Sequence, residues 1–239
     1  PLVVPEVNPQ AILKHKGIIA NPNCSTIIMV MALKPIYDLA KIKRVIVSTY
    51  QAVSGAGKEG IDELDAQVRD HSEGREMTAN ILPSASAEKH YPIAFNLIPQ
   101  IDVFCDNLYT KEEMKMVNET KKIMEDYEMR ITATTIRVPV YRSHSESVNI
   151  ELEKEVDLGA MREALAKFPG VTVQDDPSKQ EYPMPLYTSE KDDVYVGRLR
   201  RDESCEKSYN IWVVGDQIRK GAALNTLQIA ETMIKNGWI

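Results

Sequence analysis

Residues 17–26 read GIIANPNCST and contain the signals for a strand, a turn and the start of a helix. The apolar residues 17–20 predict a short strand, and Asn21-Pro22-Asn23 predicts a turn that begins a helix. The following residues 26–33 are apolar on nearly every side, which is typical of a buried helix. Cys24 therefore stands at the predicted junction of a turn and a buried helix.

Further along the chain, segments with strand and helix character are interspersed. β-branched residues predict strands over residues 44–50, 131–138, 147–152, 194–199 and 210–214, besides a short one at 2–4. Apolar periodicity predicts helices over residues 58–70, 111–125, 158–167 and 218–235, and a capping box of Thr110 and Glu113 begins the second. Residues 71–108 predict a loop-rich segment that wraps a surface or a partner subunit. Because strict βαβ alternation is missing, we predict an α+β fold with a mixed, mostly antiparallel sheet and helices on one face.

Composition narrows the class of protein. The chain has 239 residues, of which 43% are hydrophobic and 27% charged, with net charge −6, so it can bury a sizeable core. The acidic balance argues against nucleic-acid binding, and no run of about 18 apolar residues predicts a membrane span. The first ten residues lack the basic region and cleavage site of a signal peptide. Because position 1 is not Met, we expect the numbering to start inside a longer natural chain.

The cysteines point to a reducing compartment. Cys24, Cys105 and Cys205 are odd in number and widely spaced, so they predict neither a disulfide framework nor a zinc site. We therefore expect a cytoplasmic protein without a metal centre.

Cys24 is the first candidate catalytic residue. A cysteine at a helix start lies near unpaired backbone N–H groups and the positive end of the helix dipole, which stabilise a thiolate and lower the thiol pKa. The same N–H groups suit an oxyanion formed by nucleophilic attack. Position alone leaves open that Cys24 is simply a small buried residue.

His144 and Arg137 are the next candidates. His144, at the entry to a predicted strand, is a natural acid–base partner for a thiolate, although a histidine bonded to a nearby hydroxyl fits equally. Arg137 ends an apolar strand, and a buried guanidinium needs an anionic partner. That partner is either a substrate carboxylate, which a guanidinium binds with two parallel hydrogen bonds, or an internal carboxylate.

Other signals are weaker when taken singly. Glu119 and Lys122 have the i, i+3 spacing that places them on one helix face, as in many solvated surface pairs. Gln51 is polar at a strand end. The turn Ser54-Gly55-Ala56-Gly57 lets a ligand approach the backbone, but it is neither a GxGxxG nor a Walker motif.

Taken together and in this order, the motifs resemble those of the aspartate-semialdehyde dehydrogenase family, in the form typical of Gram-positive-type bacterial enzymes. The resemblance spans almost the whole chain. It rests on GIIANPNCST (17–26), VSTYQAVSGAG (47–57), HYPIAFNLIPQID (90–102), NETKKIM (118–124), RVPVYRSHSESV (137–148), VTVQDDP (171–177) and GAALNTLQIAE (221–231).

The resemblance implies a role for each candidate residue. Cys24 would be the nucleophile, His144 the general acid–base, and Gln51 a group that orients the acyl carbon. The substrate would contact Asn23, Arg137 (α-carboxylate), Glu119 (amino group) and Lys122 (phosphate). The nicotinamide of NADP would lie against Ser54, Gly55, Ala56, Gly57 and Asn225.

The implied reaction is the reductive dephosphorylation of L-aspartyl-4-phosphate. The Cys24 thiolate attacks, phosphate leaves, NADPH reduces the thioester, and aspartate 4-semialdehyde is released. This reaction serves the biosynthesis of lysine, diaminopimelate, threonine and methionine.

The resemblance also implies a domain layout, with a catalytic part like the C-terminal domain of glyceraldehyde-3-phosphate dehydrogenase. Residues 1–23 would be a remnant of a dinucleotide-binding domain, 24–217 the catalytic and dimerisation domain, and 218–239 a helix that packs on the first domain. The family's glycine-rich fingerprint has no match here, so we expect about 100 upstream residues to be missing. The chain alone should then bind NADP poorly, lack full activity, expose apolar surface on residues 1–35 and 218–235, and form a homodimer.

Three alternatives remain at this point. N-acetyl-γ-glutamyl-phosphate reductase shares the chemistry, although its acetylated amine would not call for Glu119. A cysteine hydrolase would use Cys24 and His144 without NADP. A dimerisation module without activity would leave Cys24 an inert thiol.

Overall fold

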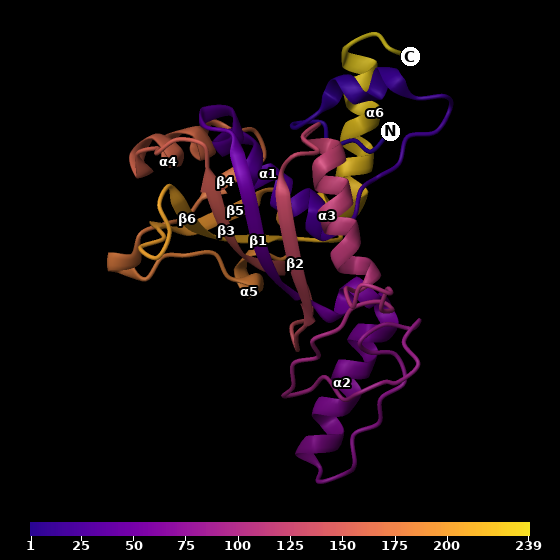
Figure 1. Cartoon of the computed structure of the whole chain (residues 1–239). Coiled ribbons are helices and arrows are strands. Elements are labelled where there is room, and N and C mark those ends of the chain that lie inside the picture. The colour runs from indigo at the N-terminus through magenta and orange to yellow at the C-terminus, as the bar shows by residue number, and fades with distance from the viewer.

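A six-stranded sheet with the order β2-β1-β3-β6-β5-β4 forms the centre of the computed structural model, which describes residues 1–239 (Figure 1). Strands β1–β2 and β4–β5 are parallel, and the pairs β1–β3, β3–β6 and β5–β6 are antiparallel. This confirms the predicted mixed, mostly antiparallel sheet. The strands are β1 (Ile42–Gln51), β2 (Arg130–Arg137), β3 (His144–Leu152), β4 (Val171–Val173), β5 (Val194–Arg201) and β6 (Ser208–Gly215).

Three helices cover one face of the sheet, as predicted. They are α1 (Cys24–Leu39), α3 (Lys111–Ile123) and α4 (Leu158–Lys167), and α1 lies between the other two. The main hydrophobic core joins them to alternate residues of the strands, such as Val45 and Val47 of β1. Residues 25–33 of α1 are buried on all sides, which explains why they are apolar at every angle around the helix.

The opposite face of the sheet is half-buried and has no long helix. Tyr50 of β1 and Trp212 of β6 lie on it, with their ring centroids 5.6 Å apart. The short helix α5 (Pro185–Thr188) and the residues before it border this face, and Trp212 donates a hydrogen bond to the Pro183 carbonyl. The face is therefore partly apolar and open to a further layer.

Helix α2 (Lys58–Ser72) and the loop-rich residues 73–108 project from the sheet as a separate lobe (Figure 1). Buried polar side chains of α2 hold this irregular backbone. The Glu63 carboxylate accepts hydrogen bonds from the backbone N–H groups of residues 80–82, and Gln67 Oε1 accepts from those of residues 93 and 94. The predicted loop-rich segment is thus ordered by side chains rather than by strands.

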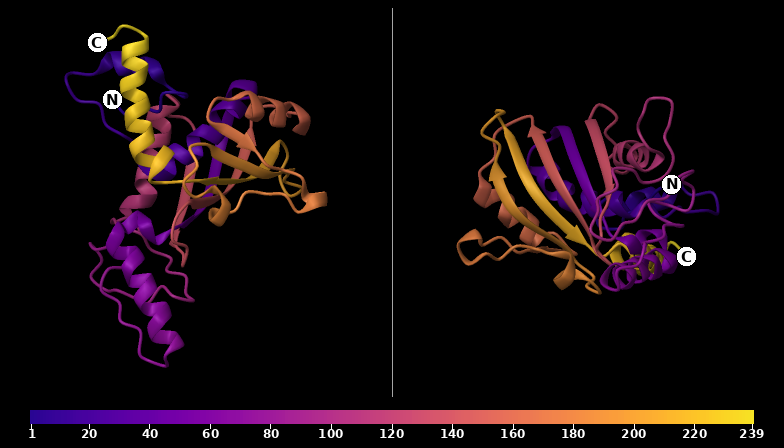
Figure 2. Two further views of the ribbon diagram at one scale, coloured as in Figure 1. Left: turned by 180° about the vertical axis from the view of Figure 1, so that it is seen from behind. Right: turned by 90° about the horizontal axis from the view of Figure 1, so that it is seen from below.

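The two ends of the chain pack together beside α3 (Figures 1 and 2). The helix predicted over 218–235 is a π-helical turn η4 (Arg219–Ala223) followed by α6 (Leu224–Lys235). The 3-10 helix η1 (Pro9–Lys14) packs on α6, and the remaining short helices are η2 (Val53–Ala56) and η3 (Pro177–Lys179).

The predicted strands at 2–4 and 17–20 are wrong. These residues share only one isolated parallel bridge, Leu2 to Ala20. Pro5 and Pro9 provide no backbone N–H, and no third strand lies beside this pair. The expected apolar exposure near both ends is observed, since Leu13, Ile18, Leu227 and Ile234 are all more than half exposed. None of the helices combines the length and the apolar composition required to cross a membrane.

Candidate functional site

Cys24 begins α1, directly after the N-cap residue Asn23. The Asn23 side chain accepts a hydrogen bond from the Thr26 N–H at 3.1 Å, which orders the first turn. Cys24 Sγ lies 3.5 Å from His144 Nε2. The π-helical turn packs tightly on the cysteine, because a Cβ added to Gly221 would lie 3.0 Å from Cys24 Cβ.

The surroundings of Cys24 act on its thiol pKa in both directions. Burial raises its pKa to about 12, and the Glu112 carboxylate adds to this rise. The Ser25 N–H and the Arg137 guanidinium lower the pKa, but by less than burial raises it. The predicted low pKa at the helix start is therefore corrected, since desolvation outweighs the N-terminal N–H groups.

His144 is fully buried at the first position of β3. Its Nδ1 accepts a hydrogen bond from the backbone N–H of Ala52 at 3.0 Å, while Nε2 faces Cys24. Burial and the nearby Arg137 guanidinium keep the pKa of His144 well below its usual value. Both effects favour the neutral form of the imidazole.

Arg137 is a buried guanidinium without an internal counter-ion. It ends β2, is 2% exposed, and donates to the carbonyls of Pro83 at 3.2 Å and Ala52 at 2.8 Å. Burial lowers its pKa to about 10, the nearby Glu112 carboxylate opposes this fall, and no carboxylate lies within ion-pair distance of the guanidinium. This excludes the internal salt bridge and favours an anionic ligand, because an uncompensated buried charge is costly.

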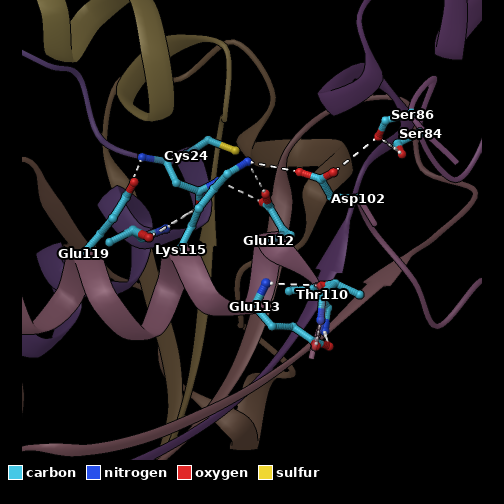
Figure 3. Close-up of polar contacts among 12 residues, drawn as sticks. Cys24, Ser84, Ser86, Asp102, Thr110, Glu112, Glu113, Lys115 and Glu119 are labelled. Carbon is cyan, nitrogen blue, oxygen red and sulfur yellow. Dashed lines mark hydrogen bonds and ion pairs between the residues drawn. The ribbon is translucent and has the colours of Figure 1, made fainter. Parts of the chain in front are cut away.

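Gln51 donates a hydrogen bond to the carboxylate of Glu112, a residue that the sequence patterns did not indicate. Gln51 and Arg137 are register partners at the carboxyl ends of the parallel strands β1 and β2. The first turn of α3 lies beside them, and Glu112 Oε1 accepts from Gln51 Nε2 at 3.2 Å and from Asn23 Nδ2 at 2.8 Å. Lys115 Nζ lies 3.4 Å from Glu112 Oε2 and is partly exposed (Figure 3).

Lys115 also contacts Asp102, which accepts a hydrogen bond from Ser86 in the projecting lobe (Figure 3). Glu112 and Lys115 have the same i, i+3 spacing as Glu119 and Lys122. Spacing cannot choose between these pairs. The two pairs differ in their distance from the carboxyl ends of β1 and β2, and this distance is known only from the packing of α3 in the folded chain.

The predicted pair Glu119 and Lys122 lies further along α3. Glu119 Oε2 accepts the Asn23 N–H at 2.7 Å and therefore braces the turn before Cys24 (Figure 3). Burial raises the pKa of Glu119. Lys122 is exposed and lies two helical turns, about 10 Å, beyond Lys115. Lys122 makes no hydrogen bond or ion pair with Cys24, His144 or Arg137.

The glycine turn lies against the site. Residues 53–56 form η2, and a Cβ added to Gly55 would lie 2.7 Å from Arg137 Nη1 and 3.2 Å from His144 Cε1. Only glycine permits this approach, whereas Gly57, with φ of +82°, faces open space. Gln217, which sequence reasoning also missed, holds the turn by donating to Ser54 Oγ and accepting from the Ser143 N–H.

Asn225 makes its hydrogen bonds inside the protein. It is fully buried, donates to the Val3 carbonyl at 3.0 Å and to Asn21 Oδ1 at 2.7 Å, and accepts from Lys220 at 3.1 Å. The side chain predicted to contact nicotinamide thus ties the base of α6 to the N-terminal residues.

Comparison with known proteins identifies the family of the chain. A family profile described as "Semialdehyde dehydrogenase, dimerisation domain" matches residues 33–220. Aspartate-semialdehyde dehydrogenase from Aquifex aeolicus (strain VF5) is 55% identical over 100% of this chain and 69% of that relative. The Bacillus subtilis (strain 168) enzyme is 52% identical over 98% of this chain and 68% of its own length. The chain thus spans about two thirds of the length of these relatives.

Solved structures show the same arrangement of elements. Aspartate semialdehyde dehydrogenase II from Vibrio cholerae, solved in complex with ASA, has a TM-score of 0.91 and 47% identity over 98% of this chain and 68% of that chain. The Candida albicans enzyme, solved with NADP, has a TM-score of 0.72 and 25% identity over 100% of this chain and 68% of that one. The profile, the sequence identities and the shared architecture agree, and the chain belongs to the aspartate-semialdehyde dehydrogenase family.

Proposed function

We propose that this chain carries the catalytic centre for NADP-dependent reductive dephosphorylation of L-aspartyl-4-phosphate to L-aspartate 4-semialdehyde, through a thioester on Cys24. This step would serve the biosynthesis of the aspartate-derived amino acids. The free cysteines support a cytoplasmic location.

The buried Arg137 guanidinium is the observation that carries the proposal. The guanidinium is close enough to Cys24 and Glu112 to interact with both electrostatically. Its hydrogen bonds within the protein go to two neutral backbone carbonyl groups. A small substrate with a carboxylate supplies the missing negative charge and places its acyl carbon near Cys24. A hydrolase acting on neutral acyl groups would have no use for this cation.

We assign the remaining substrate contacts to Glu112 and Lys115 instead of Glu119 and Lys122. The Glu112 carboxylate is buried between Gln51, Asn23 and Lys115, where it suits a substrate ammonium group. The partly exposed Lys115 ammonium suits the departing phosphate. Glu119 then acts by holding the backbone before Cys24.

NADP is proposed because a structural neighbour is solved with it. The turn at residues 54–57 fits a flat ring, since Gly55 lies directly against His144 and Gly57 has open space beside it. When bound, the cofactor supplies hydride to the acyl carbon. Gly55 and Gln217 hold the turn in place, and Asn225 is left to stabilise α6.

The test measures the reverse reaction of the natural polypeptide that contains these residues, using aspartate semialdehyde, phosphate and NADP. We expect Cys24→Ala to abolish activity and Arg137→Lys to raise the KM for the semialdehyde by about tenfold or more, because the paired hydrogen bonds are lost. Lys115→Met should raise the KM for phosphate, and the matched control Lys122→Met should leave it unchanged.

The opposite result for the two lysines would overturn the assignment of Lys115. Turnover of N-acetyl-γ-glutamyl semialdehyde in place of aspartate semialdehyde would overturn the proposed substrate. Hydrolytic turnover without NADP would overturn the proposed reaction class.

We further propose that the open sheet face forms a homodimer. A hollow in this face is lined by Ser147, Tyr182, Arg198 and Trp212, beside the aromatic pair of Trp212 and Tyr50. The matching profile is named for dimerisation. Trp212→Glu should shift the protein to monomers in analytical ultracentrifugation, while the exposed control Tyr127→Glu, in the turn between α3 and β2, should not. Dimers that persist in Trp212→Glu would exclude this face.

A further inference from the structure

Asp102 lies at a sharp turn where the projecting lobe leads back to α3. Its φ of +68° is in the left-handed region, which residues other than glycine, asparagine and aspartate seldom adopt. The turn is held by local hydrogen bonds, since Asp102 Oδ1 accepts the Val103 N–H at 2.8 Å and the Gln100 amide donates to the Asp102 carbonyl at 3.1 Å. The loop that carries the carboxylate therefore also fixes its position.

The two oxygens of the Asp102 carboxylate have different partners (Figure 3). Besides the Val103 N–H, Oδ1 accepts the hydroxyl of Ser86, from an earlier part of the lobe, at 3.3 Å. Oδ2 lies 3.4 Å from Lys115 Nζ. The Asp102 side chain is 24% exposed and that of Lys115 is 46% exposed, so small ions can reach the pair from solvent.

Lys115 Nζ lies between two carboxylates, since Glu112 Oε2 of the same helix is also 3.4 Å away. Burial lowers the pKa of Lys115, but Glu112 and Asp102 outweigh burial and raise it. Burial raises the pKa of Asp102, but the Val103 N–H and Lys115 outweigh burial and lower it. The charged forms of Lys115 and Asp102 are therefore both favoured.

The two carboxylates differ in their other contacts. Glu112 Oε1 accepts from Gln51 and Asn23, inside the site, where the substrate ammonium group is assigned to it. The Asp102 side chain instead reaches Lys115 from the lobe, with its remaining hydrogen bonds to Ser86 and Val103. An anion that binds Lys115 from solvent must therefore share the ammonium group with Asp102.

We propose that Asp102 is a positioning residue that acts through Lys115, because its carboxylate competes with phosphate for the ammonium group and so weakens phosphate binding. The inference rests on the proposed function, in which Lys115 binds the departing phosphate, and adds a residue of the lobe to that step. Asp102 itself does not touch the acyl group. Weaker binding limits the return of phosphate to the thioester, the reaction that reforms the acyl phosphate.

Asp102→Asn removes the charge and keeps the turn. Asparagine tolerates positive φ, and its side-chain oxygen can still accept the Val103 N–H and the Ser86 hydroxyl. In the reverse reaction of the natural polypeptide, we expect the KM for phosphate to fall by about threefold or more. The KM for aspartate semialdehyde should change by less than about twofold, because Glu112 and Arg137 are untouched.

Asp106→Asn is the matched control, because it removes the same charge from an exposed residue of the same loop and should alter neither KM. A double variant shows whether Asp102 acts through Lys115. In the Lys115→Met background, Asp102→Asn should change the KM for phosphate by less than about twofold, since the group for which carboxylate and phosphate compete is gone. An unchanged or raised KM in Asp102→Asn alone, or an equal fall in both backgrounds, overturns the inference.

Titration with inorganic phosphate, followed by ³¹P NMR, separates this inference from the proposed function. The Kd for phosphate should be lower in Asp102→Asn than in the wild type by about threefold or more, and unchanged in Asp106→Asn. Equal affinity in the wild type and Asp102→Asn, or binding by neither, overturns the inference even in an active enzyme. A wild-type protein that turns over no aspartate semialdehyde overturns the proposed function, while the difference in Kd still decides the role of Asp102.

Discussion

At the scale of single residues, Glu146 is a carboxyl group buried inside the sheet. It lies on β3 between Thr49 of β1 and Val213 of β6, and is fully buried. Neither of its carboxylate oxygens has a hydrogen-bond partner. Burial raises the pKa of Glu146 well above its usual range, which favours the protonated form in the folded protein.

This gives a prediction for stability against pH. Because the folded pKa is raised, the stability contributed by Glu146 is fully present below pH 4.5, its ordinary pKa, and is lost as pH rises toward the folded pKa. Glu146→Gln removes this dependence. Between pH 4.5 and the folded pKa, the free energy of unfolding of the variant should therefore rise relative to that of the wild type by about 1.4 kcal/mol per pH unit. Urea unfolding at pH 5 and pH 8 measures it, and a constant difference between the two proteins at both pH values would contradict it.

At the scale of elements, the start of α3 shows how a local signal positions the site. The predicted capping box is present, with Thr110 Oγ1 accepting from the Glu113 N–H and Glu113 Oε2 accepting from the Thr110 N–H. Glu113 Oε1 also accepts from the Thr135 N–H of β2 at 3.0 Å. The cap thus ties α3 to the edge strand and places Glu112 beside Gln51.

Glu113→Ala should therefore affect both stability and catalysis. Two buried N–H groups lose their acceptor, so the free energy of unfolding should fall by about 1–3 kcal/mol. The KM for aspartate semialdehyde should rise as well, because Glu112 is no longer held beside Gln51. The exposed neighbour Lys111→Ala is the matched control, with almost no change expected. An unchanged KM in a destabilised Glu113→Ala protein would show that the cap has no part in positioning the site.

At the scale of the whole molecule, a buried ammonium group is one of the contacts that join the two chain ends. Lys220 is 1% exposed, and its Nζ contacts Glu6 at 2.6 Å, Gln228 at 2.6 Å and Asn225 at 3.1 Å. The neighbouring Gly221 packs on Cys24. The packing of α6 on the N-terminal residues is therefore coupled to the cover over Cys24.

Glu6→Gln leaves the Lys220 charge buried without its counter-ion and should destabilise this contact by about 3–5 kcal/mol. Amide exchange should then accelerate in residues 1–20 and in α6, and alkylation of Cys24, read by peptide mass spectrometry, should become faster. The double variant Glu6→Gln/Lys220→Met should recover most of the protection. Lys14→Ala, which removes an exposed pair with Glu125, should change neither measurement. Unaltered exchange in Glu6→Gln would show that the ends are held by their apolar contacts alone.

Local sequence patterns were sufficient to predict those features whose physical cause lies within a few residues of the chain. The buried helix after Cys24, the capping box at Thr110, the β-branched strands and the loop-rich residues 71–108 all follow from side chains within a few positions of one another. The motif order was enough to predict the family, and the profile and relatives confirm it. Cys24, His144, Gln51 and Arg137 were named from these motifs and do lie around one site.

Other features depend on contacts between distant parts of the chain. Glu112 and Lys115 have the same helical spacing as Glu119 and Lys122, and only the packing of α3 against the ends of β1 and β2 distinguishes the pairs. The raised pKa of Cys24 and the donor facing His144 Nδ1 likewise come from residues that folding brings together. Burial and hydrogen bonding depend on distance in space, and a periodic sequence pattern records only distance along the chain.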